Sequence, residues 1–257
     1  MLKFQRTSVN TQANYMPRTA LGWFYSTVKL FKNWPEIYRD KLQKKETREV
    51  FLRNGFSISM SKRDAVLPIV DEIFREKVYG DLSMLKGAPI IIDIGAHIGI
   101  FVLYVKSQIP QAKMYCFEPS IENNIFLKKN IENNKLKDCY ISNNGLAGQE
   151  GSRILHIDGS SSGKNSLFGE KGQLQQIEVT TLPKILSKIG PVDFVKIDIE
   201  GAEVEVMDSL SERDFSLIKT IAIECKPNYK EKLQQKLEKF GFKEISYIHS
   251  AALFTKK

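Results

Sequence analysis

The residues best suited to chemistry lie in the stretch IIDIGAHIGI, where an aspartate is followed by two glycines four residues apart. Asp93 ends a run of strand-forming residues, and Gly95 and Gly99 stand where that strand would turn into a helix. In a parallel α/β sheet this turn is the usual cradle for a nucleotide-type ligand. The next predicted strand ends in Glu118, 19 residues after Gly99, where a carboxylate can accept hydrogen bonds from ribose hydroxyls. These residues predict a site for a nicotinamide dinucleotide or for S-adenosylmethionine (SAM).

The spacing of the glycines separates these two cofactors. A dinucleotide fingerprint has glycines at the first, third and sixth places, so that the backbone can reach a pyrophosphate. Counted from Gly95, the third place is His97 and the sixth is Ile100. A histidine there would crowd a pyrophosphate, which SAM does not contain. The turn therefore favours SAM, whose amino acid end and ribose can lie beside it.

The elements that would position this turn alternate between strands and helices from Pro89 onward. Nearly continuous apolar runs are typical of strands covered on both faces, and their alternation with helices predicts a parallel, doubly wound α/β sheet. The predicted strands are residues 90–95, 113–119, 139–144, 192–200, 218–225, 242–248 and 251–257. The predicted helices are residues 99–108, 120–134 and 231–240.

One segment interrupts this alternation. Residues 152–157 and 175–182 predict an extra hairpin between the third and fourth strands. They flank DGSSSGKNSLFGEKG, residues 158–172, whose Gly and Ser content predicts a mobile connection. We expect this connection to be a flap at the acceptor mouth, which excludes water when it closes.

The N-terminal third of the chain differs from the rest in charge. Residues 1–89 carry 16 Lys and Arg against 9 Asp and Glu, whereas residues 90–257 carry 22 against 21. We therefore expect a basic N-terminal extension, residues 1–88, followed by an α/β domain, residues 89–257. Such a basic surface with aromatic residues is typical of contact with nucleic acid or with an anionic membrane surface.

Within this extension the sequence predicts helices and one β-hairpin. Residues 1–48 are predicted to be helical and irregular, and Asn54-Gly55 is a strong hairpin signal. Pairing across that turn places Phe51, Phe56, Ile58 and Met60 on one face. The stretch DAVLPIVDEIFREKVY predicts a helix capped by Asp64, with Val66, Val70 and Ile73 buried.

The hydrophobicity pattern and the cysteines of the sequence indicate the cellular compartment. No apolar run approaches the ~18 residues of a membrane span, and the N-terminus lacks the apolar core of a signal peptide. The cysteines Cys116, Cys139 and Cys225 lie far apart without metal-ligand spacing or a disulfide framework. We expect a cytoplasmic protein with reduced cysteines and no metal site.

The motifs IIDIGAHIGIF, YCFEPS, TTLPKIL, VKIDIEGAE and IAIEC, in this order, resemble the FkbM-type family of SAM-dependent methyltransferases. The resemblance covers residue 49 to the C-terminus and implies a class I methyltransferase fold: a seven-stranded, mostly parallel Rossmann-like sheet with helices on both faces. It also implies SAM as cofactor and methyl transfer to oxygen on sugars or natural products. The chain departs from the family in Leu182-Pro183 and in NGLAGQ after the third strand.

The resemblance assigns cofactor-binding roles. Ala96 and His97 would contact SAM through their backbone, and Asn144, at the end of the third strand, would lie near the adenine. The full cofactor set is Asp93, Gly95, Ala96, His97, Gly99, Glu118, Asn144 and Asp198.

Asp198 and Glu200 follow the fourth strand and are the candidate catalytic residues. The carboxyl ends of parallel strands converge on one crevice, so Asp198 should lie beside the methionine part of SAM and Glu200 farther out, toward the acceptor. A carboxylate there could take the proton of an acceptor hydroxyl. Alternatively, both acids only favour the N-terminus of the following helix, or Asp198 and Glu224 hold a divalent cation.

The function that these observations favour is O-methylation of a small-molecule or glycan acceptor. An RNA-modifying or nucleic-acid-binding protein is the alternative suggested by the basic extension, and nucleic acid is the less favoured partner. A SAM-fold binding module without activity and a nicotinamide oxidoreductase are further alternatives.

Overall fold

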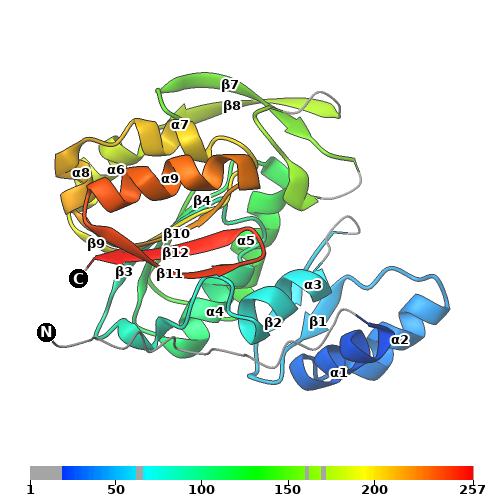
Figure 1. The fold of residues 1–257 in the computed structure, drawn as a ribbon. Helices are drawn as coiled ribbons and strands as arrows, with labels where there is room; N and C mark the ends of the chain where they lie inside the picture. The colour runs from blue at the N-terminus through cyan, green and yellow to red at the C-terminus, as the bar shows by residue number, and fades with distance from the viewer. Residues whose placement is uncertain (1–18, 62–65, 160–161, 169–171, 257) are drawn as a thin grey trace, which may run out of the picture.

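The structure, a computed structural model, describes residues 19–61, 66–159, 162–168 and 172–256. Its centre is a seven-stranded sheet with the order β11-β12-β10-β9-β3-β4-β5, in which β12 alone runs against the other strands (Figure 1). The strands are β3 (Ile90–Ile94), β4 (Lys113–Phe117), β5 (Cys139–Ser142), β9 (Val192–Ile197), β10 (Ile218–Glu224), β11 (Phe242–Ile248) and β12 (Ala251–Lys256). The predicted fold class is confirmed.

Helices cover both faces of this sheet because successive strand residues point to opposite sides. Ile91 of β3 packs into one hydrophobic cluster with α4 and α5, and Ile92 packs into a second cluster with α6, α7 and α9. The bounds are α4 (Ile100–Gln108), α5 (Ile121–Asn133), α6 (Leu182–Ile189), α7 (Glu203–Asp208), α8 (Glu212–Ser216) and α9 (Pro227–Lys239). Figure 1 shows the two helical layers on either side of the strands.

The fourth strand in chain order ends earlier than predicted. β9 stops at Ile197, and Glu200 has a φ of +53°, so the alternation expected over residues 192–200 does not continue. The Glu203 carboxylate accepts hydrogen bonds from the backbone N–H groups of Ile199 and Gly201, which gives the chain a turn in place of a strand. Asp198 and Glu200 therefore do not lie on one side of a strand.

A smaller sheet stands beside the main one. It consists of β6 (Gly145–Leu146), β7 (Gly151–Ile157) and β8 (Gln173–Thr180), in the order β6-β8-β7. The antiparallel pair β7–β8 confirms the predicted extra hairpin. Of the connection between them, residues 160–161 and 169–171 lie outside the described residues, and Ser162–Lys164 forms a short 3-10 helix.

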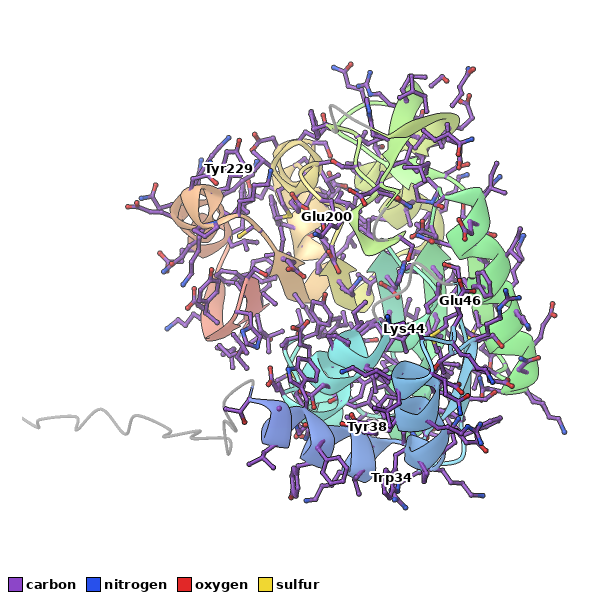
Figure 2. All side chains as sticks on the ribbon, turned by 90° about the vertical axis from the view of Figure 1, so that its right-hand side faces the viewer. Trp34, Tyr38, Lys44, Glu46, Glu200 and Tyr229 are labelled. Carbon is purple, nitrogen blue, oxygen red and sulfur yellow. The ribbon has the colours of Figure 1, made fainter. Side chains whose placement is uncertain are left out.

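The N-terminal part contains α1 (Ala20–Leu30), α2 (Trp34–Leu42), the hairpin strands β1 (Glu49–Phe51) and β2 (Ser57–Ser59), α3 (Val66–Val70), a π-helical turn (Asp71–Arg75) and a 3-10 turn (Leu82–Met84). Figure 2 shows Trp34 and Tyr38 of α2 at the end of the molecule remote from Glu200. The predicted cap, Asp64, lies outside the described residues.

The predicted face of the hairpin is wrong at Phe51. Val50 pairs with Ile58 and both are fully buried, whereas Phe51 pairs with Ser57 and is 40% exposed. The turn is longer than a two-residue loop, because the backbone N–H of Leu52 donates to the carbonyl of Phe56. This register turns Phe51 away from the core.

The buried residues of the N-terminal part share one hydrophobic cluster with α4 and α5. Val50 and Ile58 of the hairpin belong to the same cluster as Leu103 of α4 and Leu127 of α5. The division of the chain after residue 88 stays a prediction, but no separate core marks it among the described residues. No helix in the described ranges is long and apolar enough to cross a bilayer.

Candidate active site

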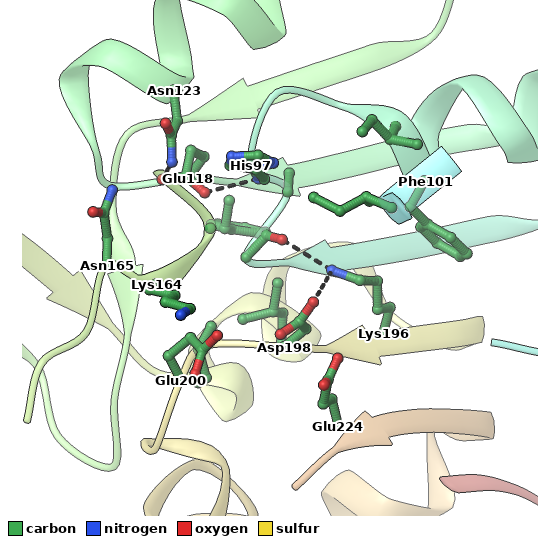
Figure 3. A pocket seen from close by; sticks show the side chains of 18 of the residues that line it. His97, Phe101, Glu118, Asn123, Lys164, Asn165, Lys196, Asp198, Glu200 and Glu224 are labelled. Atoms are coloured by element: carbon green, nitrogen blue, oxygen red, sulfur yellow. Dashed lines mark hydrogen bonds and ion pairs between the residues drawn. The ribbon is translucent and has the colours of Figure 1, made fainter. Parts of the chain in front are cut away.

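A cavity of about 310 Å³ opens at the carboxyl ends of β3, β4, β9 and β10 (Figure 3). The small sheet closes one side, and the other side is formed by residues before β3 and by the turn between β11 and β12. Six of the predicted site residues line the cavity: Gly95, Ala96, His97, Glu118, Asp198 and Glu200. Asp93, Gly99 and Asn144 are not among the lining residues.

The turn after β3 is shaped by close contact with the end of β9. Gly95 has a φ of +77°, and a Cβ atom there would lie 1.8 Å from the carbonyl oxygen of Asp198. A side chain at this position is therefore incompatible with the backbone. Gly99, at a φ of +90°, begins α4, and a Cβ atom there would lie 2.8 Å from the Leu127 side chain. Contact with the backbone requires the glycine at position 95, whereas at position 99 the left-handed backbone favours it.

Glu118 fastens this turn to the end of β4. It is 5% exposed, and its carboxylate accepts hydrogen bonds from the backbone N–H groups of His97 at 2.8 Å and Ser120 at 3.0 Å. The Asn123 amide donates a third at 3.3 Å. Burial raises the pKa of Glu118, and the charge of His97 and these hydrogen bonds oppose that shift. A carboxylate offers about four acceptor positions, so Glu118 can still accept from a ligand hydroxyl.

Lys196 of β9 supports the turn from beneath. Its Nζ atom donates to the carbonyl oxygen of Gly95 at 2.9 Å and lies 3.1 Å from Asp93 and 3.5 Å from Asp198. Burial alone would lower the pKa of Lys196, but Asp93 and Asp198 outweigh it and the pKa is raised. Asp93 is fully buried beside this ammonium group. Asp93 thus orients Lys196 and does not face the cavity.

Two carboxylates meet at the hydroxyl of Tyr79. This hydroxyl donates to Asp198 at 2.8 Å and lies 3.3 Å from Glu224 at the end of β10 (Figure 3 shows both acids). The Ser250 hydroxyl also donates to Glu224. The charge of Asp198, followed by burial, raises the pKa of Glu224 to about 7. Burial and the two neighbouring acids raise the pKa of Tyr79, which keeps it a hydrogen-bond donor.

Glu200 lies at the rim of the cavity on the turn after β9. Partial removal from water raises the pKa of its carboxyl to about 7, and the charges of Asp198 and Glu224 act in the same direction. The left-handed backbone at Glu200 directs this residue away from the line of the strand. The pocket therefore has two carboxyls, Glu200 and Glu224, each with a pKa of about 7.

Residues 162–168, which we call the strap, form part of the cavity wall. Hydrogen bonds hold the strap near both of its ends. His97 Nε2 and Ser162 Oγ are 2.7 Å apart, and the Asn123 amide donates to the Ser162 carbonyl at 3.2 Å. At its other end, the Ser166 hydroxyl donates to the carbonyl of Glu200 at 2.6 Å. Part of the expected flap is thus fastened to the turn after β3, to α5 and to the turn after β9.

Nothing in the sequence indicates that Tyr79 and Ser250 contact Asp198 and Glu224. Tyr79 and Ser250 come from segments far from the glycine turn, and only the fold brings their hydroxyls to Asp198 and Glu224. Asn144 is half-buried and donates its backbone N–H to Ser142, while its neighbours Gly145 and Leu146 reach the cavity. Its predicted place near the adenine stays a prediction. Among the described residues no group of three or more metal-ligating side chains could hold a metal ion.

The family model described as the methyltransferase FkbM domain matches residues 93–245. The chain belongs to this family. This FkbM-family chain is similar to methyltransferase sdnD of Sordaria araneosa, at 28% identity over 191 residues, which cover 61% of the chain and 73% of the relative. It is similar to methyltransferase 1 of Beauveria bassiana, at 26% identity over 176 residues, 60% of the chain and 70% of the relative.

Solved structures give a more distant likeness to this FkbM-family protein. A methyltransferase from Pyrococcus furiosus has a TM-score of 0.47 at 16% identity, covering 86% of this chain and 95% of that one. The family match confirms the resemblance expected from the motifs, and the protein is a SAM-dependent methyltransferase.

The residues of the FkbM-family turn fit SAM. Gly95, Ala96 and His97 line the cavity, and Glu118 retains acceptor capacity for ribose hydroxyls. Asp198 lies next to Gly95 and adds negative charge, which suits a cationic ligand. When bound, SAM supplies an electrophilic methyl group on its positively charged sulfur.

Proposed function

We propose that this methyltransferase methylates a hydroxyl oxygen of a small-molecule or glycan acceptor. The observation that supports the proposal is the pair of carboxyls, Glu200 and Glu224, that line the cavity with a pKa of about 7. A hydroxyl loses its proton when it is methylated, and a proton acceptor works best when its pKa lies near the working pH. A carboxyl with an ordinary pKa would be a weaker base.

The roles of the acids follow from their positions. Asp198 is held by Tyr79 and Lys196 and lies against Gly95, so we assign it to cofactor binding. Glu200 lies at the rim on a turn and is the first candidate for the base. Glu224 is the second candidate, because the hydroxyls of Tyr79 and Ser250 fix its carboxylate in the cavity. Alignment of the reactants supplies much of the remaining rate enhancement.

The test is a screen with labelled SAM against sugars, hydroxylated small molecules and RNA, followed by kinetics of Glu200→Gln, Glu224→Gln, Asp198→Asn and Glu212→Gln on the acceptor found. Glu200→Gln should lower turnover by roughly 10²–10⁴-fold with SAM affinity nearly kept, and Asp198→Asn should mainly weaken SAM binding. Glu212→Gln, an exposed acid on α8, is the matched control.

Four results would contradict the proposal or one of its parts. Labelling of nitrogen, carbon or sulfur acceptors alone would remove the assignment to oxygen, and labelling of RNA alone would favour the nucleic-acid alternative. If folded Glu200→Gln and Glu224→Gln enzymes both turn over at the wild-type rate, neither carboxyl is the base. A lower melting temperature with unchanged turnover would show that the acids are structural.

We further propose a cytoplasmic location. The three cysteines, Cys116, Cys139 and Cys225, are free thiols in the structure, and free thiols are typical of a reducing compartment.

A further inference from the structure

Helices α1 and α2 expose an apolar surface that is separate from the cavity. We call it the α1–α2 face: Leu21, Phe24, Tyr25, Trp34, Tyr38 and Leu42. Leu21 is 79% exposed and Leu42 is 85% exposed, the two largest values among the apolar side chains reported as exposed. Phe24 and Tyr25 are 44% and 41% exposed. None of the six residues lines the cavity.

Ring contacts connect the apolar side chains of the two helices, and Trp34 and Tyr38 are only partly exposed. Leu21, Phe24 and Tyr25 have the i, i+3, i+4 spacing that places residues on one side of a helix, and Trp34, Tyr38 and Leu42 follow at i, i+4, i+8. The ring of Phe24 lies 5.6 Å from that of Trp34 and 5.4 Å from that of Tyr38. In Figure 2, Trp34 and Tyr38 lie together at the edge of the molecule. The two helices thus expose a joint apolar stripe.

The segment that carries this stripe is rich in positive charge. Residues 19–48 contain seven Lys and Arg but three Asp and Glu. Five of the basic residues are exposed lysines that have no ion pair within the described ranges: Lys29, Lys32, Lys41, Lys44 and Lys45. The ammonium group of Lys29 lies 4.9 Å above the ring of Tyr25. The local charge is unlike the near balance of residues 90–257.

We propose that the α1–α2 face binds the surface of an anionic lipid bilayer. Exposed leucines gain free energy when they enter the boundary between headgroups and acyl chains, and Trp and Tyr favour that depth. Lysines beside them attract anionic headgroups. Helices α1 and α2 and the residues beside them supply all three kinds of side chain: aliphatic, aromatic and basic.

The same features disfavour the other two partners. A second copy of the chain would bring two positively charged surfaces together, which costs free energy. Nucleic acid would attract the lysines and stack on the aromatic rings, but it would leave the two most exposed large apolar side chains, Leu21 and Leu42, without a favourable contact. A lipid surface satisfies both the charge and the leucines.

The experiment uses the two tryptophans of the full chain, Trp23 in α1 and Trp34 in α2. Tryptophan emission and co-sedimentation are measured with phosphatidylcholine vesicles that contain or lack phosphatidylserine. Binding should appear only with phosphatidylserine, with emission shifted to shorter wavelength. It should weaken in ~1 M salt, where the Debye length falls to about 3 Å.

Variants assign the binding to this face. The double variant Leu21→Ser/Leu42→Ser should have an affinity for anionic vesicles that is lower by roughly tenfold or more, because burial of each leucine side chain in the lipid contributes to the binding free energy. Ile245→Ser, at an exposed apolar residue of β11, is the matched control and should bind as the wild type does. Circular dichroism checks that all variants fold, which is expected because these side chains contact little of the core.

Four results would overturn the inference. The first is that the protein does not bind anionic vesicles, and the second is that it binds neutral vesicles equally well. The third is that Leu21→Ser/Leu42→Ser binds anionic vesicles as tightly as the wild type does. The fourth is a shift of emission caused by RNA, or by raised protein concentration without lipid, when vesicles cause none.

Discussion

At the scale of residues, the pocket is organised by two side chains that connect its acids. Tyr79 donates its hydroxyl to Asp198 and approaches Glu224, and Lys196 connects Asp93 and Asp198 to the glycine turn. Lys196 forms ion pairs with Asp93 and Asp198, but the like charges of Asp198, Glu200 and Glu224 remain close together. Burial of Glu200, followed by the charges of its neighbours, and the charge of Asp198 beside Glu224 explain why these two carboxyls keep a proton at a higher pH than ordinary carboxyls do.

This crowding of carboxyls predicts that the free energy of unfolding falls as the pH rises. The pKa of Glu224 is about 7 in the folded protein and close to its ordinary value of 4.5 in the unfolded chain. A raised folded-state pKa gives stability that is present below pH ~4.5 and lost as pH approaches 7. Glu224→Gln should therefore raise stability at pH 8 by roughly 1–2 kcal/mol, a value reduced by partial solvent access. The gain should shrink toward pH 5.

The measurement is the melting temperature of the two proteins without SAM across this range of pH. Glu212→Gln, on the surface of α8, serves as control and should give no such pH-dependent difference. A constant difference between Glu224→Gln and wild type at all pH values would show that the carboxyl does not titrate in this range.

At the scale of elements, the turn after β3 and the turn after β9 form one unit, because the backbone of Asp198 occupies the space beside Gly95. Gly95→Ala should therefore cost several kcal/mol or prevent folding. Gly241→Ala is the matched control: its φ is +85° but no atom lies within 4 Å of the added Cβ, so it should cost only about 1–2 kcal/mol. Urea unfolding measures both. Similar losses would mean that the left-handed backbone, not the contact with Asp198, requires the glycine.

The strap gives a second prediction at this scale. Ser166→Ala removes the hydrogen bond to the carbonyl of Glu200 and should cost less than about 1.5 kcal/mol of global stability. Amide exchange across residues 162–168 should nevertheless become faster, because this end of the strap is released. Ser187→Ala, whose hydroxyl bonds within α6, is the control. Exchange that is unchanged in Ser166→Ala would show that this contact does not hold the strap.

The sequence predicted the elements better than it predicted their contacts. Apolar runs such as residues 90–94 identify buried strands directly, and the extra hairpin was equally clear. The end of β9 is not evident from the sequence. Glu203, a residue beyond the strand, accepts hydrogen bonds from backbone N–H groups that a longer strand would have used for pairing. Phe51 was misplaced because the register depends on the length of the turn. Gly95 was correctly singled out, yet the sequence could not show that Asp198 requires it.

At the scale of the whole molecule, Asn130 of α5 joins the N-terminal hairpin to the cofactor turn. Its amide nitrogen donates to the carbonyls of Ser59 at 3.0 Å and Ile98 at 2.8 Å, and its oxygen accepts from the N–H of Ser59 at 2.7 Å. All three contacts are buried. Together with the shared hydrophobic cluster, they couple the basic N-terminal part to the site that binds SAM.

This coupling predicts that the chain unfolds as one unit. Tryptophan fluorescence reports the N-terminal helices, since Trp23 and Trp34 lie there, and circular dichroism reports all elements. The two signals should give the same urea midpoint. Asn130→Ala should lower stability by roughly 2–4 kcal/mol, because three buried backbone groups lose their partner, and both signals should shift together. Asn133→Ala, which loses one 3.4 Å bond to Ser59 Oγ, should cost under about 1 kcal/mol. A fluorescence midpoint well below that of circular dichroism would show instead that the N-terminal helices unfold independently.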